Sequence, residues 1–272
     1  MAHVFQVGAG SGGMPVLDMI CRDSRISRVT LVEPDVYKLH NVERHLFPRS
    51  AVGELKAMLA EDWLKERRPE LQVETLACDL LEPAKQAIIE KAVGEADIGV
   101  CAADNEAAKF HFDLLMRRYG KPWTVGEVLS GGIGGFVHWF VPGGPCYGCV
   151  ASHLKREATV EKPKAPDYSQ PGGPVEETTV PASRASIGVV AGLHAVVTLA
   201  LLAEKENYQP GFTSLLLTLQ RVEQVFDEAF RPYRFRIPRL ADCLICRAEA
   251  TPSSVGDLDV ALAQALARLG NE

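Results

Sequence analysis

The apolar residues in the first half of the chain come in short runs, separated by longer stretches in which they recur at helical spacing. Short apolar runs are typical of buried strands, and recurrence every three to four residues is typical of helices with one buried side. Strands and helices that alternate in this way predict a parallel sheet covered by helices. Strands are expected at 4–7, 29–32, 72–76 and 96–102. Four helices are expected: one that contains Val16 to Ile20, one over 51–68, one over 83–93, and one that contains Phe110 to Leu115.

The pattern changes after Pro122, where strands follow one another through glycines instead of helices. Strands are expected at 123–125 and 136–140, and later at 212–219 and 233–237. We therefore predict an α/β fold: a Rossmann-like, mostly parallel sheet with helices on both faces that continues into antiparallel strands. The glycines between 131 and 135 either let an extended peptide approach closely or simply form a turn.

Two segments lie outside this pattern. Residues 155–184 are rich in Pro, Gly, Lys and Glu, which predicts a mobile crossover loop. Residues 251–272 contain apolar positions at helical spacing and predict a C-terminal amphipathic helix that docks on its own domain or serves a partner. We expect residues 1–250 to form one domain.

Composition and charge exclude several classes of protein. The chain has 272 residues and a net charge of −6, which argues against a nucleic-acid partner. The longest apolar stretch, 187–203, is interrupted by Gly188, Gly192 and His194, so a buried helix is favoured over a membrane span. The N-terminus lacks the pattern of a secretion signal, and we expect a cytoplasmic protein.

The first candidate site is the glycine turn Gly8-Ala9-Gly10-Ser11-Gly12-Gly13, which follows the first strand. Exposed amides at such a turn, followed by a helix N-terminus, suit an anion. Glu33, at the end of the second strand, stands about 20 residues further on, where a ribose hydroxyl is held in Rossmann proteins. A glycine turn that only packs a helix on a sheet has the same pattern, so this motif alone is weak evidence.

The segment after Glu33 indicates which nucleotide is bound. Asn41 and Arg44 follow the ribose position, where polyphosphate rather than nicotinamide would be met. We therefore predict ATP. Lys56 lies off the apolar stripe of Leu55, Met58, Leu59 and Trp63 on its helix, which would let it face a ligand.

Asp104 and Asn105 follow the fourth strand, at the sheet edge where ligands of open α/β sheets bind. Helix capping and metal binding are both open for this pair.

The cysteines suggest a metal site. Cys146 and Cys149 form one Cys-x-x-Cys pair, and Cys243 and Cys246 form another, while Cys21, Cys78 and Cys101 are scattered. In a reducing compartment two such pairs suit structural Zn²⁺, although a redox role and unpaired cysteines remain alternatives.

Together these motifs resemble the ThiF/MoeB adenylyltransferases, which share their fold with the adenylation half of ubiquitin-activating enzymes. The family pattern Asp-x-Val-x-x-x-Asn-Leu-x-Arg-Gln is similar to residues 35–45, and its Val-Gly-x-x-Lys matches 52–56. Its Thr-Asp-Asn is similar to 103–105, and its two Cys-x-x-Cys pairs are present. The resemblance runs from Val4 to about Arg247.

The resemblance implies a function and a role for each site residue. The family adenylates the C-terminal glycine of a small ubiquitin-like or sulfur-carrier protein with ATP and Mg²⁺, and it suggests a homodimer. Arg44, Lys56 and Asp104 would be catalytic, with Asp104 holding Mg²⁺. The nucleotide would be bound by Gly8, Gly10, Gly13, Glu33, Asp35, Asn41, Arg44, Lys56, Asp104 and Asn105.

Some features depart from the family. Glu33 replaces the commoner Asp and His45 replaces Gln. Some relatives lend an arginine to the partner's ATP site from helices before the first strand, and here that cation must come from elsewhere or be dispensed with. Ubiquitin-activating enzymes place a nucleophilic cysteine after the first Cys-x-x-Cys, and it has no counterpart here between Val150 and Asp242. We therefore expect no internal thioester, and expect the acyl-adenylate to pass straight to a sulfur donor, an amine or the cysteine of a separate conjugating protein. The alternatives are a non-catalytic scaffold subunit and an NAD-binding oxidoreductase.

Overall fold

A computed structural model describes residues 1–154, 182–204 and 211–247. Its centre is an eight-stranded sheet with the strand order β3-β2-β1-β4-β5-β6-β7-β8. The strands are β1 (Ala2–Val7), β2 (Ile26–Val32), β3 (Gln72–Leu76), β4 (Ile98–Cys101), β5 (Trp123–Val128), β6 (Gly134–Phe140), β7 (Ser214–Thr218) and β8 (Pro232–Phe235).

The sheet changes character at β5. Strands β3, β2, β1, β4 and β5 are parallel, whereas β6, β7 and β8 continue the sheet by antiparallel pairing. The predicted mixed sheet is therefore confirmed.

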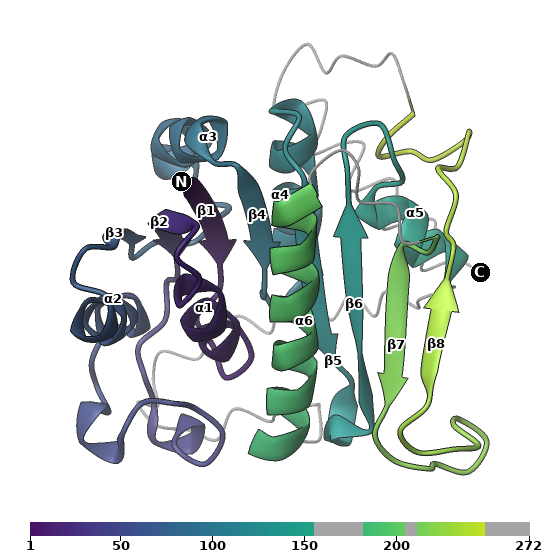
Figure 1. Cartoon of the computed structure of the whole chain (residues 1–272), viewed down its shortest axis with the longest axis horizontal. Helices are drawn as coiled ribbons and strands as arrows, with labels where there is room; N and C mark the ends of the chain where they lie inside the picture. The colour runs from purple at the N-terminus through teal and green to yellow at the C-terminus, as the bar shows by residue number, and fades with distance from the viewer. Residues whose placement is uncertain (155–181, 205–210, 248–272) are drawn as a thin grey trace, which may run out of the picture.

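Helices cover both faces of the sheet (Figure 1). The helices of the first face, which packs as one apolar core, are α1 (Gly13–Cys21), α2 (Lys56–Arg67) and α6 (Arg184–Glu204). Those of the second face are α3 (Gln86–Glu95), α4 (Glu106–Arg118) and α5 (Tyr147–His153). Neighbouring residues of β1 point to opposite cores, Val4 to the first and Phe5 to the second, so the buried strands are apolar on both sides.

Two helix predictions were wrong in part. The helix expected over 51–68 begins only at Lys56, after a short 3-10 helix at Arg49–Ala51. Its buried residues are Lys56, Ala57, Ala60 and Leu64, while Met58 is exposed. The expected helix over 83–93 is a 3-10 helix at Pro83–Lys85 followed by α3.

The glycine cluster between β5 and β6 is explained by the turn. Gly131 and Gly132 have positive φ angles of 71° and 68°, which other residues rarely adopt. Gly135 has no room for a side chain, because a Cβ there would lie 2.5 Å from Val190 of α6. These glycines therefore serve the turn and the packing of β6.

Helix α6 is long and apolar enough to span a membrane by length and composition, but half of that stretch is buried inside the protein. It packs beside α1 on the first face, as a core helix does (Figure 1). Most of the predicted crossover loop and the whole of the predicted C-terminal helix lie outside the described residues.

Candidate functional site

The glycine turn connects β1 to α1 at the carboxyl end of the parallel strands. Gly8 has a φ of 92°, and a Cβ at this position would lie 2.7 Å from the carbonyl oxygen of Ala102. A Cβ at Gly13 would lie 2.3 Å from the carbonyl oxygen of Gly8. Gly10 has open space around it, so this part of the turn can receive a ligand.

The peptide groups of Ala9 are held from two sides. The backbone N–H of Ala9 donates to Oε2 of Glu33 at 2.6 Å, and its carbonyl oxygen lies 2.9 Å from Nε2 of His45. The other oxygen of Glu33 accepts the N–H of Asp35 at 2.9 Å. Glu33 and His45 thus fix the shape of the glycine turn.

The ionisation of these two buried groups is perturbed. Burial raises the pKa of Glu33, although the charge of Lys56 opposes the shift. Burial lowers the pKa of His45 to about 4, and the charges of Lys56, Arg184 and Arg44 also act to lower it. The neutral ring carries its proton on Nε2, because the carbonyl oxygen of Ala9 can only accept. Lys56, Arg184 and Arg44 therefore lie close enough to His45 to affect its charge.

Asn41 and Arg44 come from the segment between β2 and α2. Asn41 ends a 3-10 helix at Leu39–Asn41, and its side-chain oxygen accepts the N–H of Lys38 at 3.0 Å. Its carbonyl oxygen accepts the N–H of Arg44 at 3.1 Å and that of His45 at 2.9 Å. These bonds form a tight turn that contains the half-buried Arg44 and the buried His45.

Lys56 is the first residue of α2 and is buried, rather than exposed on the helix surface. Its Nζ donates to Oδ2 of Asp35 at 2.7 Å, and its backbone N–H donates to the carbonyl oxygen of the same residue at 2.9 Å. These contacts hold the start of α2 against the end of β2.

Asp104 and Asn105 lie between β4 and α4. Asn105 caps α4, with its side-chain oxygen accepting the N–H of Ala108 at 2.7 Å. Asp104 is exposed at the sheet edge that carries the glycine turn. The capping interpretation is therefore confirmed for Asn105, and the carboxylate of Asp104 can reach a ligand.

Sequence reasoning missed two residues of this site. His45 stood out only as a departure from a motif. Arg184, at the start of α6, is more than a hundred residues away in the sequence from the groups it approaches, and no local pattern marks it. Its neighbour Ile187 lies 4.0 Å from the position of a Cβ on Gly12, which puts the start of α6 beside the glycine turn.

The two Cys-x-x-Cys pairs meet at the start of α5. The Sγ atoms of Cys146, Cys149, Cys243 and Cys246 all lie within 4.8 Å of one another, and all four residues are buried. The sulfurs of Cys146 and Cys243 are 3.5 Å apart, as are those of Cys149 and Cys246. Disulfide sulfurs would be about 2.05 Å apart, whereas four ligands about 2.3 Å from a tetrahedral Zn²⁺ lie about 3.8 Å from each other. The residues fit zinc, and the predicted meeting of the two pairs is confirmed.

Comparison with known proteins decides the family. The model of the ThiF family matches residues 1–232. The chain belongs to the ThiF family. It is 28% identical over 263 residues to the sulfur carrier protein adenylyltransferase of Thermus thermophilus, covering 95% of this chain and 87% of the relative. It is 27% identical to the adenylyltransferase and sulfurtransferase MOCS3 of Culex quinquefasciatus, covering 90% of this chain but only 50% of that protein.

A solved ThiF-like structure has the same fold. Escherichia coli MccB with ATP superposes with a TM-score of 0.64 at 20% identity, covering 90% of this chain and 66% of MccB. This ThiF-family chain therefore shares its fold with MccB.

The two departures from the ThiF motif both contact the backbone of Ala9. The longer side chain of Glu33 accepts the N–H of Ala9, and His45 bonds to the carbonyl oxygen of Ala9. These two residues therefore hold the glycine turn on both sides of Ala9.

Proposed function

We propose that this protein uses ATP to adenylate the C-terminal glycine carboxylate of a small ubiquitin-like or sulfur-carrier protein. The observation that carries the proposal is that Lys56, Arg44 and Arg184 act electrostatically on His45, which bonds to the glycine turn, and that this turn lies at the same sheet edge as Asp104. Cations around exposed amides suit a polyphosphate. The adenylyltransferases among the relatives support the choice of reaction.

The reaction needs alignment and neutralised charge more than a protein nucleophile. A carboxylate oxygen of the carrier attacks the α-phosphorus, a new P–O bond forms, and the bond from that phosphorus to the bridging oxygen breaks. Pyrophosphate leaves with the electron pair, and the acyl-adenylate remains. The protein must therefore hold three charged groups in line and stabilise the leaving group.

Each site residue has a role in this proposal. The amides of the glycine turn and the start of α1 bind phosphate, and Glu33 binds the ribose. Arg44 and Lys56 neutralise the charge that develops on the phosphates. Asp104 holds Mg²⁺, which would supply charge for the departing pyrophosphate.

The test is carrier-dependent exchange between ATP and pyrophosphate. Asp104→Ala should abolish exchange and leave the free energy of unfolding within about 0.5 kcal/mol, because the side chain is exposed. Asp62→Ala, which removes an exposed carboxylate from α2, is the matched control and should keep normal exchange. Near-normal exchange by folded Asp104→Ala would refute the role of Asp104.

Two other functions make different predictions. A non-catalytic scaffold subunit has no need of Arg44, Lys56 and Asp104 together, and it would give no exchange with any carrier. An NAD-binding oxidoreductase would be stabilised by NAD rather than by ATP in a thermal-shift assay. Stabilisation by ATP with Mg²⁺ alone would favour the proposed enzyme.

The acyl-adenylate is passed on without an internal thioester. The three cysteines outside the cluster, Cys21, Cys78 and Cys101, are all buried, and burial raises the pKa of Cys21 and of Cys101 to about 12. Such thiols are poor nucleophiles. Enzyme, carrier and MgATP run on a non-reducing gel should show no adduct that reductant removes.

The protein is proposed to be a cytoplasmic homodimer with one Zn²⁺ per chain. Val189 and Val196 are exposed on the apolar helix α6, which offers a surface for a second copy. Light scattering tests the dimer, and metal analysis of protein purified without chelator tests the zinc.

A further inference from the structure

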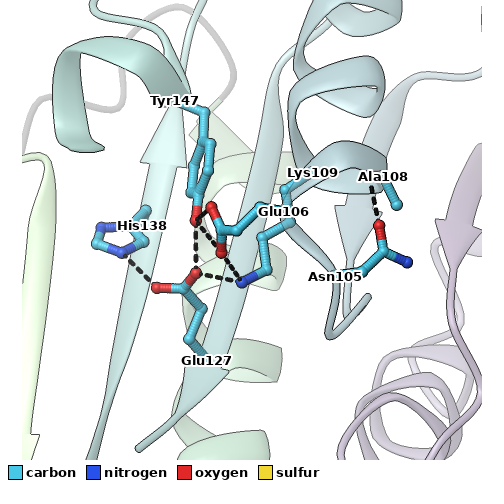
Figure 2. Close-up of polar contacts among 7 residues, drawn as sticks. All are labelled: Asn105, Glu106, Ala108, Lys109, Glu127, His138 and Tyr147. Atoms are coloured by element: carbon cyan, nitrogen blue, oxygen red, sulfur yellow. Dashed lines mark hydrogen bonds and ion pairs between the residues drawn. The ribbon is translucent and has the colours of Figure 1, made fainter. Parts of the chain in front are cut away.

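A mostly buried group of charged and polar side chains joins α4 to β5, β6 and α5 (Figure 2). The hydroxyl of Tyr147 donates to Oε1 of Glu127 at 2.7 Å and lies 3.0 Å from Oε2 of Glu106. Nζ of Lys109 bonds to both carboxylates, at 2.7 Å each. His138 approaches the other oxygen of Glu127 at 3.2 Å. We call these five residues the α4 network.

The α4 network is ionic and tightly held. Burial acts to lower the pKa of Lys109, but Glu127 and Glu106 outweigh it, and the pKa ends above its ordinary value. Lys109 is therefore charged. Removing one partner of such a buried group costs several kcal/mol, so its members keep their places in the folded protein.

Tyr147 belongs to the cysteine cluster as well as to this network. It stands between Cys146 and Cys149 in the chain, and its backbone N–H donates to Oδ1 of the buried Asp113 at 2.7 Å. Its side chain then runs along α4 to Glu106, as Figure 2 shows for its hydroxyl end. Any movement of the first cysteine pair must move this ring.

Helix α4 contacts the second cysteine pair too. Arg117, near the end of the helix, donates to the carbonyl oxygen of Ile245 at 2.8 Å. Ile245 lies between Cys243 and Cys246. One side of α4 therefore carries contacts to both pairs, while its start carries Asn105 and, just before it, Asp104.

We propose that Tyr147 is a positioning residue that couples metal binding at the four-cysteine cluster to binding of Mg²⁺ and ATP at Asp104, through Glu106 and the start of α4. This inference rests on the proposed function. Coupling between two sites is reciprocal, so nucleotide bound at one end must change the affinity for metal at the other by the same factor.

The experiment measures the equilibrium partition of Zn²⁺ between the full chain and a competing chelator, with and without Mg²⁺ and a non-hydrolysable ATP analogue. In the wild type the analogue should tighten zinc binding about fivefold, the lower end of usual coupling. Tyr147→Phe should bind one zinc and lose this effect. Tyr119→Phe is the matched control. Tyr119 lies at the far end of α4 from Glu106, its hydroxyl bonds to Glu90 of α3, and the variant should keep the effect.

A wild-type effect retained in Tyr147→Phe overturns the proposal, and so does an analogue that binds the wild type without changing zinc affinity. If Tyr147→Phe does not fold, Glu106→Gln replaces it, and the same loss of coupling is expected. Calorimetry separates this inference from the proposed function. A wild type that fails to bind the analogue refutes both, whereas one that binds it with no change in zinc affinity refutes the coupling alone.

Discussion

The nucleotide end of the sheet and the α4 network each contain a buried lysine, and the two lysines differ in their partners. Lys56 pairs with Asp35, whose side chain is 60% exposed. Lys109 pairs with two carboxylates, Glu106, which is 42% exposed, and Glu127, which is only 10% exposed. A phosphate arriving from solvent can compete for Lys56, because its partner is open to water. Lys109 is already neutralised inside the protein. Burial of a lysine therefore does not by itself mark a ligand site, and the two cases differ in that Lys109 has a second, buried carboxylate partner.

The largest effect is expected from removing the charge of Lys109 in the α4 network. Lys109→Met leaves Glu127 buried without its cation, which should lower the free energy of unfolding by about 3–5 kcal/mol. Urea unfolding measures the loss. Lys121→Met is the control, because Nζ of Lys121 donates to the carbonyl oxygen of Gly94 in α3, outside the α4 network. Equal, small losses in both variants would show that the α4 network is not held by charge.

The difference between the two lysines also shows what the sequence could and could not predict. The parallel strands, the glycine turn and the meeting of the cysteine pairs were predicted, because each leaves a local signal in composition or spacing. The helical pattern predicted that Lys56 could face a ligand. It did not predict that Lys56 is buried and paired with Asp35, because both depend on how α2 packs against the end of β2.

The α4 network left no such signal. Its contacts join residues far apart in the chain, such as Glu106 with Tyr147 at a separation of 41 and Lys109 with Glu127 at 18. Glutamate, lysine and tyrosine at these positions look like ordinary helix and strand residues until the antiparallel strands and α5 are in place. Such sites are fixed by the topology of the sheet, which local patterns do not specify.

Substitutions at the nucleotide end of the sheet should change the rate of ATP–pyrophosphate exchange more than the stability of the fold. Lys56→Ala should lower the rate of ATP–pyrophosphate exchange by about 10²-fold, if the ammonium stabilises charge that develops on the phosphates. Its ion pair reaches an exposed carboxylate, so the loss of stability should be smaller than for Lys109→Met. Arg44→Ala should lose exchange to a similar extent. Small effects on exchange from both variants would favour the scaffold function.

The smallest expected effect is the pH dependence of stability that His45 gives to the nucleotide end of the sheet. Its pKa is lowered to about 4 in the folded protein, against about 6.5 when unfolded, so the unfolded chain binds more protons between these values. Stability from this group is therefore present above pH 6.5 and is lost as the pH falls toward 4.

His45→Gln should remove that loss while keeping a side-chain N–H for the carbonyl oxygen of Ala9. At pH 5.5, one unit below the unfolded pKa, the variant should gain about 1.4 kcal/mol over the wild type relative to their difference at pH 7.5. Urea unfolding at the two pH values measures it, with the exposed His153→Gln as control. His194, whose pKa burial lowers to about 3, is unchanged in both proteins, so its contribution cancels. An identical pH response in His45→Gln and the wild type would mean that His45 is charged in the folded protein, and the Ala9 carbonyl would then be held by an imidazolium among three cations.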